Sequence, residues 1–357
     1  MKYLSLFSGI GGFELGLEQS YEQLCNVNGS KERRGEKDSQ RNEEQGFFTK
    51  KREDTTTTQR PVSKCTANII NKRPLCIGYS EIDKYAIQTY QSHFPEHKNY
   101  GDITKINENE LPDFDLIVGG FPCQAFSIAG QRKGFEDTRG TLFFDIARII
   151  KAKQPRLLFL ENVKGLLSHD GGRTFKTIIS TLTELGYDVQ WQVLNSKNFG
   201  VPQNRERVFI IGHLRGTSRP EVFPLEPSNG TNAVEINILG HKDKYRRGNQ
   251  VYARNAITET LSTCGGGGQH PCTLQPIANT LDANYAKGNS SSSERHTPRT
   301  EVMQNAMVRR LTPKECERLQ GFPDDWTVRV SDTQRYKQCG NAVTVNVIQA
   351  IAEKLLS

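Results

Sequence analysis

The segment Leu4-Ser-Leu-Phe7-Ser-Gly9-Ile-Gly11-Gly12 decides the fold class of this chain. Its apolar run reads as a short buried strand, and the glycines that follow open a helix. Glycines let a backbone approach a ligand closely, and a helix N-terminus attracts a carboxylate or a phosphate. The dinucleotide fingerprint Gly-x-Gly-x-x-Gly is incomplete, because Glu14 occupies its last position. The segment therefore predicts a strand–turn–helix unit whose turn either binds a ligand or only packs tightly.

Outward from this unit, strand and helix patterns alternate along the chain. Apolar runs predict five further strands, and apolar stripes at i, i+3, i+4 and i+7 predict helices between and after them. Such alternation is typical of an α/β fold with a doubly wound, mostly parallel sheet. The predicted strands contain residues 76–79, 115–118, 157–160, 189–193 and 208–211, and the predicted helices contain residues 87–94, 142–150, 175–185, 312–320 and 344–356.

Composition divides the chain into three parts and an insert. Residues 1–214 carry the alternating pattern, whereas residues 215–306 are rich in proline, glycine and serine and predict a smaller, loop-rich domain. We expect residues 307–357 to pack back on the first part, because an isolated amphipathic helix is only marginally stable. Residues 29–73 have too few large apolar side chains to fold alone, and we expect them to form a mobile polar insert.

Charge, cysteine content and hydropathy exclude several classes of protein. The formal net charge is +7, but the insert holds 12 Lys/Arg against 7 Asp/Glu, so the charge alone does not indicate nucleic acid. Eight cysteines without a Cys-x-x-Cys pair are too sparse for a disulfide scaffold, and we expect no metal site. No run approaches the roughly 18 apolar residues of a membrane helix, and no export signal is complete, so we expect a cytoplasmic protein without membrane contact.

Reactive side chains follow the predicted strands, at the edge where parallel α/β sheets bind ligands. Glu81 ends the second strand, where nucleotide-binding folds place an acid on ribose hydroxyls, and we expect Asp102 at the next strand end. Cys123 follows Pro122 beyond the third strand, a position that suits a nucleophile with an accessible thiolate. An exposed loop acid and a buried core cysteine are the alternatives for these positions.

Two more positions suggest acid–base or anion chemistry. Glu161 ends the fourth strand, where parallel strand order would bring it beside Cys123, and a dry pocket would raise its pKa so that it can act as an acid. Arg205 and Arg207 stand on alternate positions and share one side of an extended chain, ready for a phosphate or a base carbonyl. A loop or N-cap acid and an exposed salt-bridged pair are the alternatives here.

The order of these features resembles the motif set of the DNA (cytosine-5)-methyltransferase family of prokaryotic restriction–modification type. The likeness covers about residues 1–28, 74–214 and 307–357. It implies a Rossmann-like, S-adenosylmethionine-dependent methyltransferase fold with a catalytic and cofactor-binding domain at 1–214 and a target-recognition domain at 215–306. The motifs are Phe-Ser-Gly-Ile-Gly-Gly, Glu81, Gly-Asp-Ile103, Pro-Cys-Gln124, Glu-Asn-Val163, Gln-x-Arg-x-Arg207, Arg310-Leu-Thr-Pro-Lys-Glu-Cys316 and Gly340-Asn-Ala-Val.

The resemblance also implies the chemistry, which is methyl transfer to C5 of a cytosine flipped out of duplex DNA. Cys123 would attack C6, Glu161 would hold or protonate N3, and Arg207 would steady the base carbonyl with Arg205 nearby. Elimination would then free Cys123, with S-adenosylhomocysteine as the cofactor product. Residues 124–140 resemble the mobile loop of the family, from which Gln124 and Ser127 would contact DNA.

Cofactor and partner assignments follow from the same resemblance. Phe7 would stack on the adenine and Glu81 would bind the ribose. The partners would be double-stranded DNA and a cognate restriction endonuclease acting on the same site, and we expect a monomer that lies on the nucleoid when bound to DNA. The other cofactor residues would be Gly9, Gly11, Gly12, Asp102, Ile103, Pro122, Leu142 and Asn341, and the DNA-reading candidates in the recognition domain are Arg246, Arg247, Arg254 and Lys287.

Three features depart from the family pattern, and two other functions stay open. Ser5 stands where many members carry an acid, Ile82 stands where many carry Trp, and the insert lengthens one connection. A tRNA cytosine-5 methyltransferase is the nearest alternative, although Phe121 and a recognition region of about 90 residues favour DNA. A catalytically silent DNA-binding protein is the second. A zinc deaminase would need Pro-Cys-x-x-Cys, and a nicotinamide dehydrogenase is disfavoured by Glu14.

Overall fold

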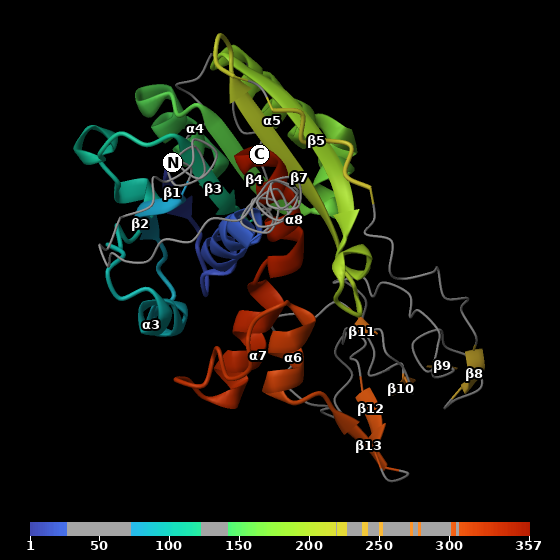
Figure 1. Ribbon diagram of the computed structural model, residues 1–357. Coiled ribbons are helices and arrows are strands. Elements are labelled where there is room, and N and C mark those ends of the chain that lie inside the picture. Colours follow the sequence, from blue (N-terminus) through green and yellow to red (C-terminus); the bar gives the residue numbers. More distant parts are fainter. Residues whose placement is uncertain are drawn as a thin grey trace, which may run out of the picture.

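The computed structural model describes residues 1–26, 73–122, 142–218, 220–226 and 311–357, together with the backbone of several short strands between residues 238 and 310 (Figure 1). Most of the predicted insert therefore lies outside the described residues, and its mobility stays a prediction. The division of the chain at residues 214 and 306 also stays a prediction.

A six-stranded sheet with the strand order β2-β1-β3-β4-β7-β5 forms the centre of the molecule (Figure 1). The first four strands of this order run parallel, whereas β7 runs antiparallel to both β4 and β5. The predicted doubly wound, mostly parallel α/β sheet is confirmed. The strands are β1 (Lys2–Leu6), β2 (Leu75–Ser80), β3 (Leu116–Gly120), β4 (Leu157–Val163), β5 (Tyr187–Asn195) and β7 (Glu206–Leu214).

Helices cover both faces of this sheet, because successive residues of a strand point to opposite faces. Leu4 and Leu158 belong to the buried cluster shared with α4 and α5, whereas Tyr3 and Leu157 belong to the cluster shared with the first helix and α8. The core is thus two apolar layers, one on each side of the strands. The helices are the first helix at residues 12–26, α3 (Lys84–His93), α4 (Leu142–Lys153), α5 (Arg173–Glu184), α6 (Pro313–Leu319), α7 (Asp332–Asn341) and α8 (Val345–Leu356).

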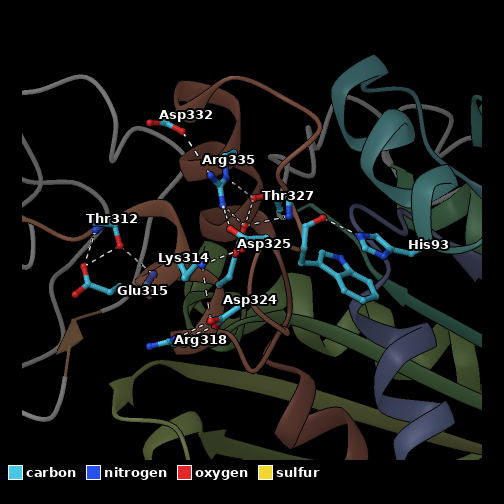
Figure 2. A network of polar contacts seen from close by, with 12 residues as sticks. His93, Thr312, Lys314, Glu315, Arg318, Asp324, Asp325, Thr327, Asp332 and Arg335 are labelled. Atoms are coloured by element: carbon cyan, nitrogen blue, oxygen red, sulfur yellow. Dashed lines mark hydrogen bonds and ion pairs between the residues drawn. The ribbon is translucent and has the colours of Figure 1, made fainter.

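A polar network holds α6, α7 and the loop between them as one unit (Figure 2). Glu317 is fully buried and accepts hydrogen bonds from the backbone N–H of Thr327 at 3.0 Å and from the guanidinium of Arg335 at 2.9 Å. Thr312 and Glu315 form a capping box that fixes the start of α6. Because the buried carboxylate is paired and hydrogen-bonded, the loop between α6 and α7 is fixed in place.

Residues from opposite ends of the chain meet beside this unit. The indole of Trp326 donates a hydrogen bond of 2.9 Å to the carbonyl oxygen of Ile10. The ring of His93 on α3 stacks on Trp326 with 3.5 Å between ring centroids and contacts its carbonyl oxygen at 2.7 Å (Figure 2). The C-terminal segment therefore packs against the glycine turn after β1.

Short strands occupy parts of the chain between β5 and α6. A five-stranded sheet has the order β13-β12-β10-β9-β8, and a separate parallel pair joins β6 to β11. No helix in the described ranges is long and apolar enough to cross a membrane. The short strands are β6 (Gln203–Asn204), β8 (Ile238–His241), β9 (Gln250–Tyr252), β10 (Cys272–Thr273), β11 (Ala278–Asn279), β12 (Glu301–Gln304) and β13 (Met307–Arg310).

The structure differs from the sequence predictions at two elements. Asp102 does not end a strand, because its carboxylate accepts hydrogen bonds from the backbone and hydroxyl of Thr104 and caps a 3-10 turn. The prediction also missed helix α7, whose surface is mostly polar. The 3-10 turns are η1 (Ile103–Lys105), η2 (Glu108–Glu110), η3 (Lys164–Leu167), η4 (His169–Gly172) and η5 (Ser196–Phe199).

Candidate active site

A cleft of about 380 Å³ opens at the carboxyl ends of the parallel strands. Its walls come from the turns after β1 and β2, the ends of β3 and β4, the residues around the start of β7, and the C-terminal end of α7. The antiparallel β7 begins at the edge where β4 ends, since Val163 pairs with Arg207. The topology therefore gathers side chains from six distant parts of the sequence, in a volume typical of small-molecule sites.

Glu161 and Arg207 form a buried ion pair in this cleft. The Nε of Arg207 lies 3.0 Å from Oε1 of Glu161, and their side chains are 16% and 10% exposed. Burial raises the pKa of Glu161 above its ordinary value, and the charges of Arg207 and then Arg205 oppose that rise only in part. Glu161 can therefore hold a proton more readily than an exposed carboxylate, which suits it to donate one.

Asn162 and Gly120 fix the backbone next to this pair. The side-chain amide of Asn162 donates a hydrogen bond of 2.8 Å to the carbonyl oxygen of Phe121, and its own oxygen accepts from the N–H of Val163. Gly120 pairs with Glu161 in the sheet register. A Cβ at this glycine would lie 2.9 Å from Oε2 of Glu161. The carboxylate therefore needs a glycine opposite it.

Arg205 is more deeply buried than Arg207 and hydrogen-bonds to backbone carbonyl oxygens. Its guanidinium donates to the carbonyl oxygens of Gly340 at 3.1 Å and Ala342 at 2.9 Å. These contacts tie the start of β7 to the end of α7, on either side of Asn341 in the cleft wall. The two arginines predicted on one side of the chain thus both line the cleft, with different contacts.

Glu81 connects the turns that follow β1 and β2. Its Oε2 accepts a hydrogen bond of 2.9 Å from the N–H of Gly9, and its Oε1 accepts from the N–H groups of Ile82 and Asp83 at 2.8 Å each. The carboxylate is therefore held in one orientation, while Oε2 keeps a lone pair for a ligand hydroxyl. Ile82, which stands where many members of the family carry Trp, is 73% exposed.

The glycine turn after β1 combines a strained residue with close packing. Phe7 lines the cleft at a φ of 53°, a left-handed conformation that costs energy for a non-glycine residue. Gly9 also lines the cleft, but Gly11 and Gly12 face protein. A Cβ on these two would lie 2.6 Å from the ring of Phe94 and 2.7 Å from Val343, respectively. Of the two predicted roles of the turn, ligand binding therefore suits Gly9, and tight packing applies to Gly11 and Gly12.

The cleft includes some of the predicted cofactor residues and leaves out others. Phe7, Gly9, Glu81, Pro122 and Asn341 line it, with Asn341 exposed. Gly11, Gly12, Asp102, Ile103 and Leu142 are not among its walls, and Ile103 is 3% exposed in the core. Several predicted residues lie outside the described part of the chain, namely Cys123, Gln124, Ser127, Arg246, Arg247, Arg254 and Lys287.

Sequence reasoning missed three polar residues of the cleft wall, Asp83, Lys337 and Gln338. Asp83 caps α3 and lies 2.6 Å from Nζ of Lys337. Burial by itself would raise the pKa of Asp83, but Lys337 and the capped N–H groups hold it below its usual range. Predicting α7 would have revealed two of the three, because positions three and four before Asn341 share its helix face.

Comparison with known proteins assigns this site to a family. A model of the C-5 cytosine-specific DNA methylase family matches residues 67–357. The chain belongs to this family. The methylase is accordingly a DNA (cytosine-5-)-methyltransferase, EC 2.1.1.37, of the restriction–modification type, as its motif order predicted.

Individual relatives of this methylase cover most or all of the chain. It is 46% identical over 289 residues to the Type II methyltransferase M1.ScrFI of Lactococcus lactis subsp. cremoris, which spans 78% of this chain and 71% of that protein. It is 36% identical over 357 residues to M.NlaX of Neisseria lactamica, across 99% and 96% of the two chains. A solved Spodoptera frugiperda DNMT2 variant shares the fold, with a TM-score of 0.62 at 16% identity over 100% and 99% of the chains.

Proposed function

We propose that this methylase transfers a methyl group from S-adenosylmethionine to C5 of cytosine in a specific short duplex sequence, through a covalent Cys123–C6 intermediate and base flipping. The observation that carries the proposal is the buried Glu161–Arg207 pair, which shares one cleft with Phe7, Glu81 and Pro122. A cytosine ring inside a duplex is out of reach for such a recessed pair, so the base must leave the stack.

The polar pair complements the Watson–Crick edge of a flipped cytosine. A protonated Glu161 donates a hydrogen bond or a proton to N3, and Arg207 donates to the base carbonyl oxygen. The raised pKa of Glu161 supports the first role, since burial keeps a proton on it at a higher pH than in water. Protonation at N3 makes C6 electrophilic, which is what a thiolate needs for attack.

Cys123 directly follows Pro122, which lines the cleft, and we assign it the nucleophile's role by its motif. Its sulfur forms a bond to C6, and the electron pair displaced from the ring makes C5 nucleophilic. S-adenosylmethionine, when bound, would supply the electrophilic methyl group that C5 attacks, and S-adenosylhomocysteine would be the leaving group. A base then removes the C5 proton, the electron pair of that bond re-forms the C5–C6 double bond, and Cys123 leaves as a thiolate while the proton on N3 returns to Glu161. Burial raises the pKa of Cys76 to about 12 and also raises that of Cys316, so neither suits this step.

The chemistry of the cleft fits the proposed cofactor. Phe7 offers an aromatic face for an adenine, and the oriented carboxylate of Glu81 offers an acceptor for ribose hydroxyls. Gln338 adds a buried amide donor that has no hydrogen-bond partner among the described residues. Asn341 completes the polar part of the wall. We assign no metal to this reaction.

We further propose that residues 215–306 recognise the target, that Gln124, Ser127, Arg246, Arg247, Arg254 and Lys287 contact the DNA, and that a cognate endonuclease cuts the same site. We also propose that the enzyme is a monomer in a prokaryotic cytoplasm, associated with the nucleoid when on DNA. Lys and Arg side chains suit these contacts because they bind phosphates and guanine edges.

The test uses S-adenosylmethionine with a labelled methyl group, unmethylated duplex DNA and bulk tRNA in parallel, followed by bisulfite sequencing. We expect label at cytosine C5 of DNA within one short motif. We expect Cys123→Ala to lose transfer while it still binds DNA, and undiminished turnover in that variant would remove the nucleophile. Label only in tRNA would establish the alternative substrate, and no label from folded protein would make the chain a silent binder.

A further inference from the structure

Gln338 on α7 carries a buried donor for which the described part of the chain supplies no acceptor. The side chain is 6% exposed and lines the cleft. Its Oε1 accepts a hydrogen bond of 3.0 Å from the hydroxyl of Thr89 on α3, whereas its Nε2 has no hydrogen-bond partner among the described residues. A buried donor without a partner destabilises the protein, so such a group indicates a ligand that completes it.

We propose that Nε2 of Gln338 donates a hydrogen bond to the carboxylate of the amino-acid tail of S-adenosylmethionine. This inference rests on the function proposed above and adds a binding residue to it. An amide N–H needs an acceptor, and the carboxylate is the strongest acceptor that the cofactor carries.

The position of Gln338 in the cleft favours the tail over the adenosine. Ile10, in the glycine turn just before the first helix, lines the cleft with Gln338. Ile10 also packs in one buried cluster with Tyr90 of α3 and with Ala342, just beyond α7. This wall therefore joins the turn before the first helix to the two helices that carry Thr89 and Gln338. A helix N-terminus attracts a carboxylate, so both donors favour the same group.

Two contacts prepare this wall for a negative charge. The hydroxyl of Thr89 donates its one proton to Oε1, which fixes that oxygen toward α3 and leaves the NH₂ as the end of the amide without a partner among the described residues. Lys337 pairs with Asp83 at 2.6 Å, and both line the same cleft. Without this lysine, the carboxylate of Asp83 would repel the cofactor's carboxylate.

The test compares ligands with and without the tail by isothermal titration calorimetry. The probes are S-adenosylmethionine, S-adenosylhomocysteine and 5′-methylthioadenosine, which keeps the adenosine and lacks the amino-acid tail. For Gln338→Met we expect the Kd of the two tailed ligands to rise about 10- to 100-fold, the loss for a hydrogen bond to a charged group. The Kd of 5′-methylthioadenosine should stay within about twofold of the wild-type value, since it makes no such bond.

Two further variants separate recognition from packing. Gln338→Glu should weaken the tailed ligands more than Gln338→Met, because its carboxylate repels theirs. Thr89→Val should give a smaller loss that disappears in the Gln338→Met background, since it acts only by orienting the amide. Gln349→Met, at a glutamine that donates to Glu353 on α8, is the matched control and should bind all three ligands normally.

The possible outcomes separate a failure of the role proposed for Gln338 from a failure of the proposed function. Equal weakening of all three ligands in Gln338→Met would mean a structural role, and unchanged binding of the tailed ligands would show that the donor serves no cofactor; either result overturns the inference alone. A folded wild-type protein that binds none of the three would overturn the proposed function and this inference together.

Discussion

At the scale of a single residue, Glu161 is constrained by two neighbouring residues and by its burial. Arg207 pairs with one oxygen, burial raises the pKa of the carboxyl, and Gly120 leaves room for the other oxygen. An acid in a dry pocket is useful only if its position is fixed, because misplacement by about 1 Å can cost 100-fold in rate. The glycine before Phe121 is therefore part of the acid's environment.

Gly120→Ala tests this dependence. The new Cβ would lie 2.9 Å from Oε2 of Glu161, and the end of that side chain can move, so we expect the acid to shift while the fold survives. Methyl transfer should fall by about 100-fold, with little change in the midpoint of thermal unfolding. Gly165→Ala is the matched control, because a Cβ there meets no atom of the described residues within 4 Å. A wild-type rate in Gly120→Ala would show that the acid tolerates displacement.

At the scale of elements, the predictions were right where the buried side chains are apolar. The six strands of the main sheet were predicted from short apolar runs, since both faces of the sheet are covered, and the amphipathic helices α4, α5 and α8 were predicted because each buries an apolar stripe. Helix α7 was missed because it buries Gln338 and Gly340 together with Tyr336 and Cys339, so its buried face is not an apolar stripe. No helical pattern therefore marks the wall that carries Asn341.

The residues of the candidate site were likewise predictable only in part. Glu161 and Glu81 were predicted from their places at the ends of parallel strands, whereas Arg207 lies beside Glu161 because the antiparallel β7 begins at the edge where β4 ends. The roles of Gly11 and Gly12 could not be separated from that of Gly9, because only the packed structure shows which glycines face protein. Contacts between distant segments, such as that of Arg205 with the end of α7, leave no local pattern in the sequence.

The contribution of the contact between β7 and α7 to stability can be measured by substituting Arg205. Arg205→Met leaves the carbonyl oxygens of Gly340 and Ala342 without this donor, which should cost about 2–4 kcal/mol of unfolding free energy. We also expect weaker cofactor binding by calorimetry, because Asn341 lies between those two residues. Arg215→Met removes an exposed arginine that pairs with Asp188 and should change neither quantity. Unchanged stability in Arg205→Met would show that the link is dispensable.

For the whole molecule, the buried carboxyl of Glu14 makes stability depend on pH. Glu14 is fully buried, accepts a hydrogen bond of 3.0 Å from Tyr90, and has a pKa raised by burial from 4.5 to about 7. The folded state therefore holds this proton more tightly than the unfolded state. The resulting stabilisation is fully present below about pH 4.5 and is lost as pH rises through about 7.

Glu14→Gln should remove this dependence, because the amide stays neutral at every pH. We expect the variant to be more stable than the wild type by up to about 3 kcal/mol at pH 8 and nearly equal to it at pH 4.5. Calorimetric unfolding at both values measures the difference. Glu22→Gln, an exposed residue of the same helix, is the control and should behave as the wild type. An equal effect of Glu14→Gln at both pH values would contradict the assignment.

The polar insert gives a second prediction for the whole molecule. The insert has too few large apolar residues to form a core. The two apolar layers that cover the sheet instead join residues that precede the insert in the sequence to residues that follow it. Replacement of residues 29–73 by a short glycine linker should leave a soluble protein with one cooperative thermal transition. Aggregation or a broadened transition would show that the insert is structural.

The contact of Trp326 with Ile10, together with the hold of Arg205 on Gly340 and Ala342, has a consequence for synthesis. The ribosome makes the glycine turn and Glu161 long before it makes α7, so a nascent chain carries its reactive groups without the wall that closes the cleft. We therefore expect methylation competence only after residue 342 has been added to the chain. A premature stop before α7 should yield an inactive fragment, and two separately expressed fragments split before α6 should regain activity only on association.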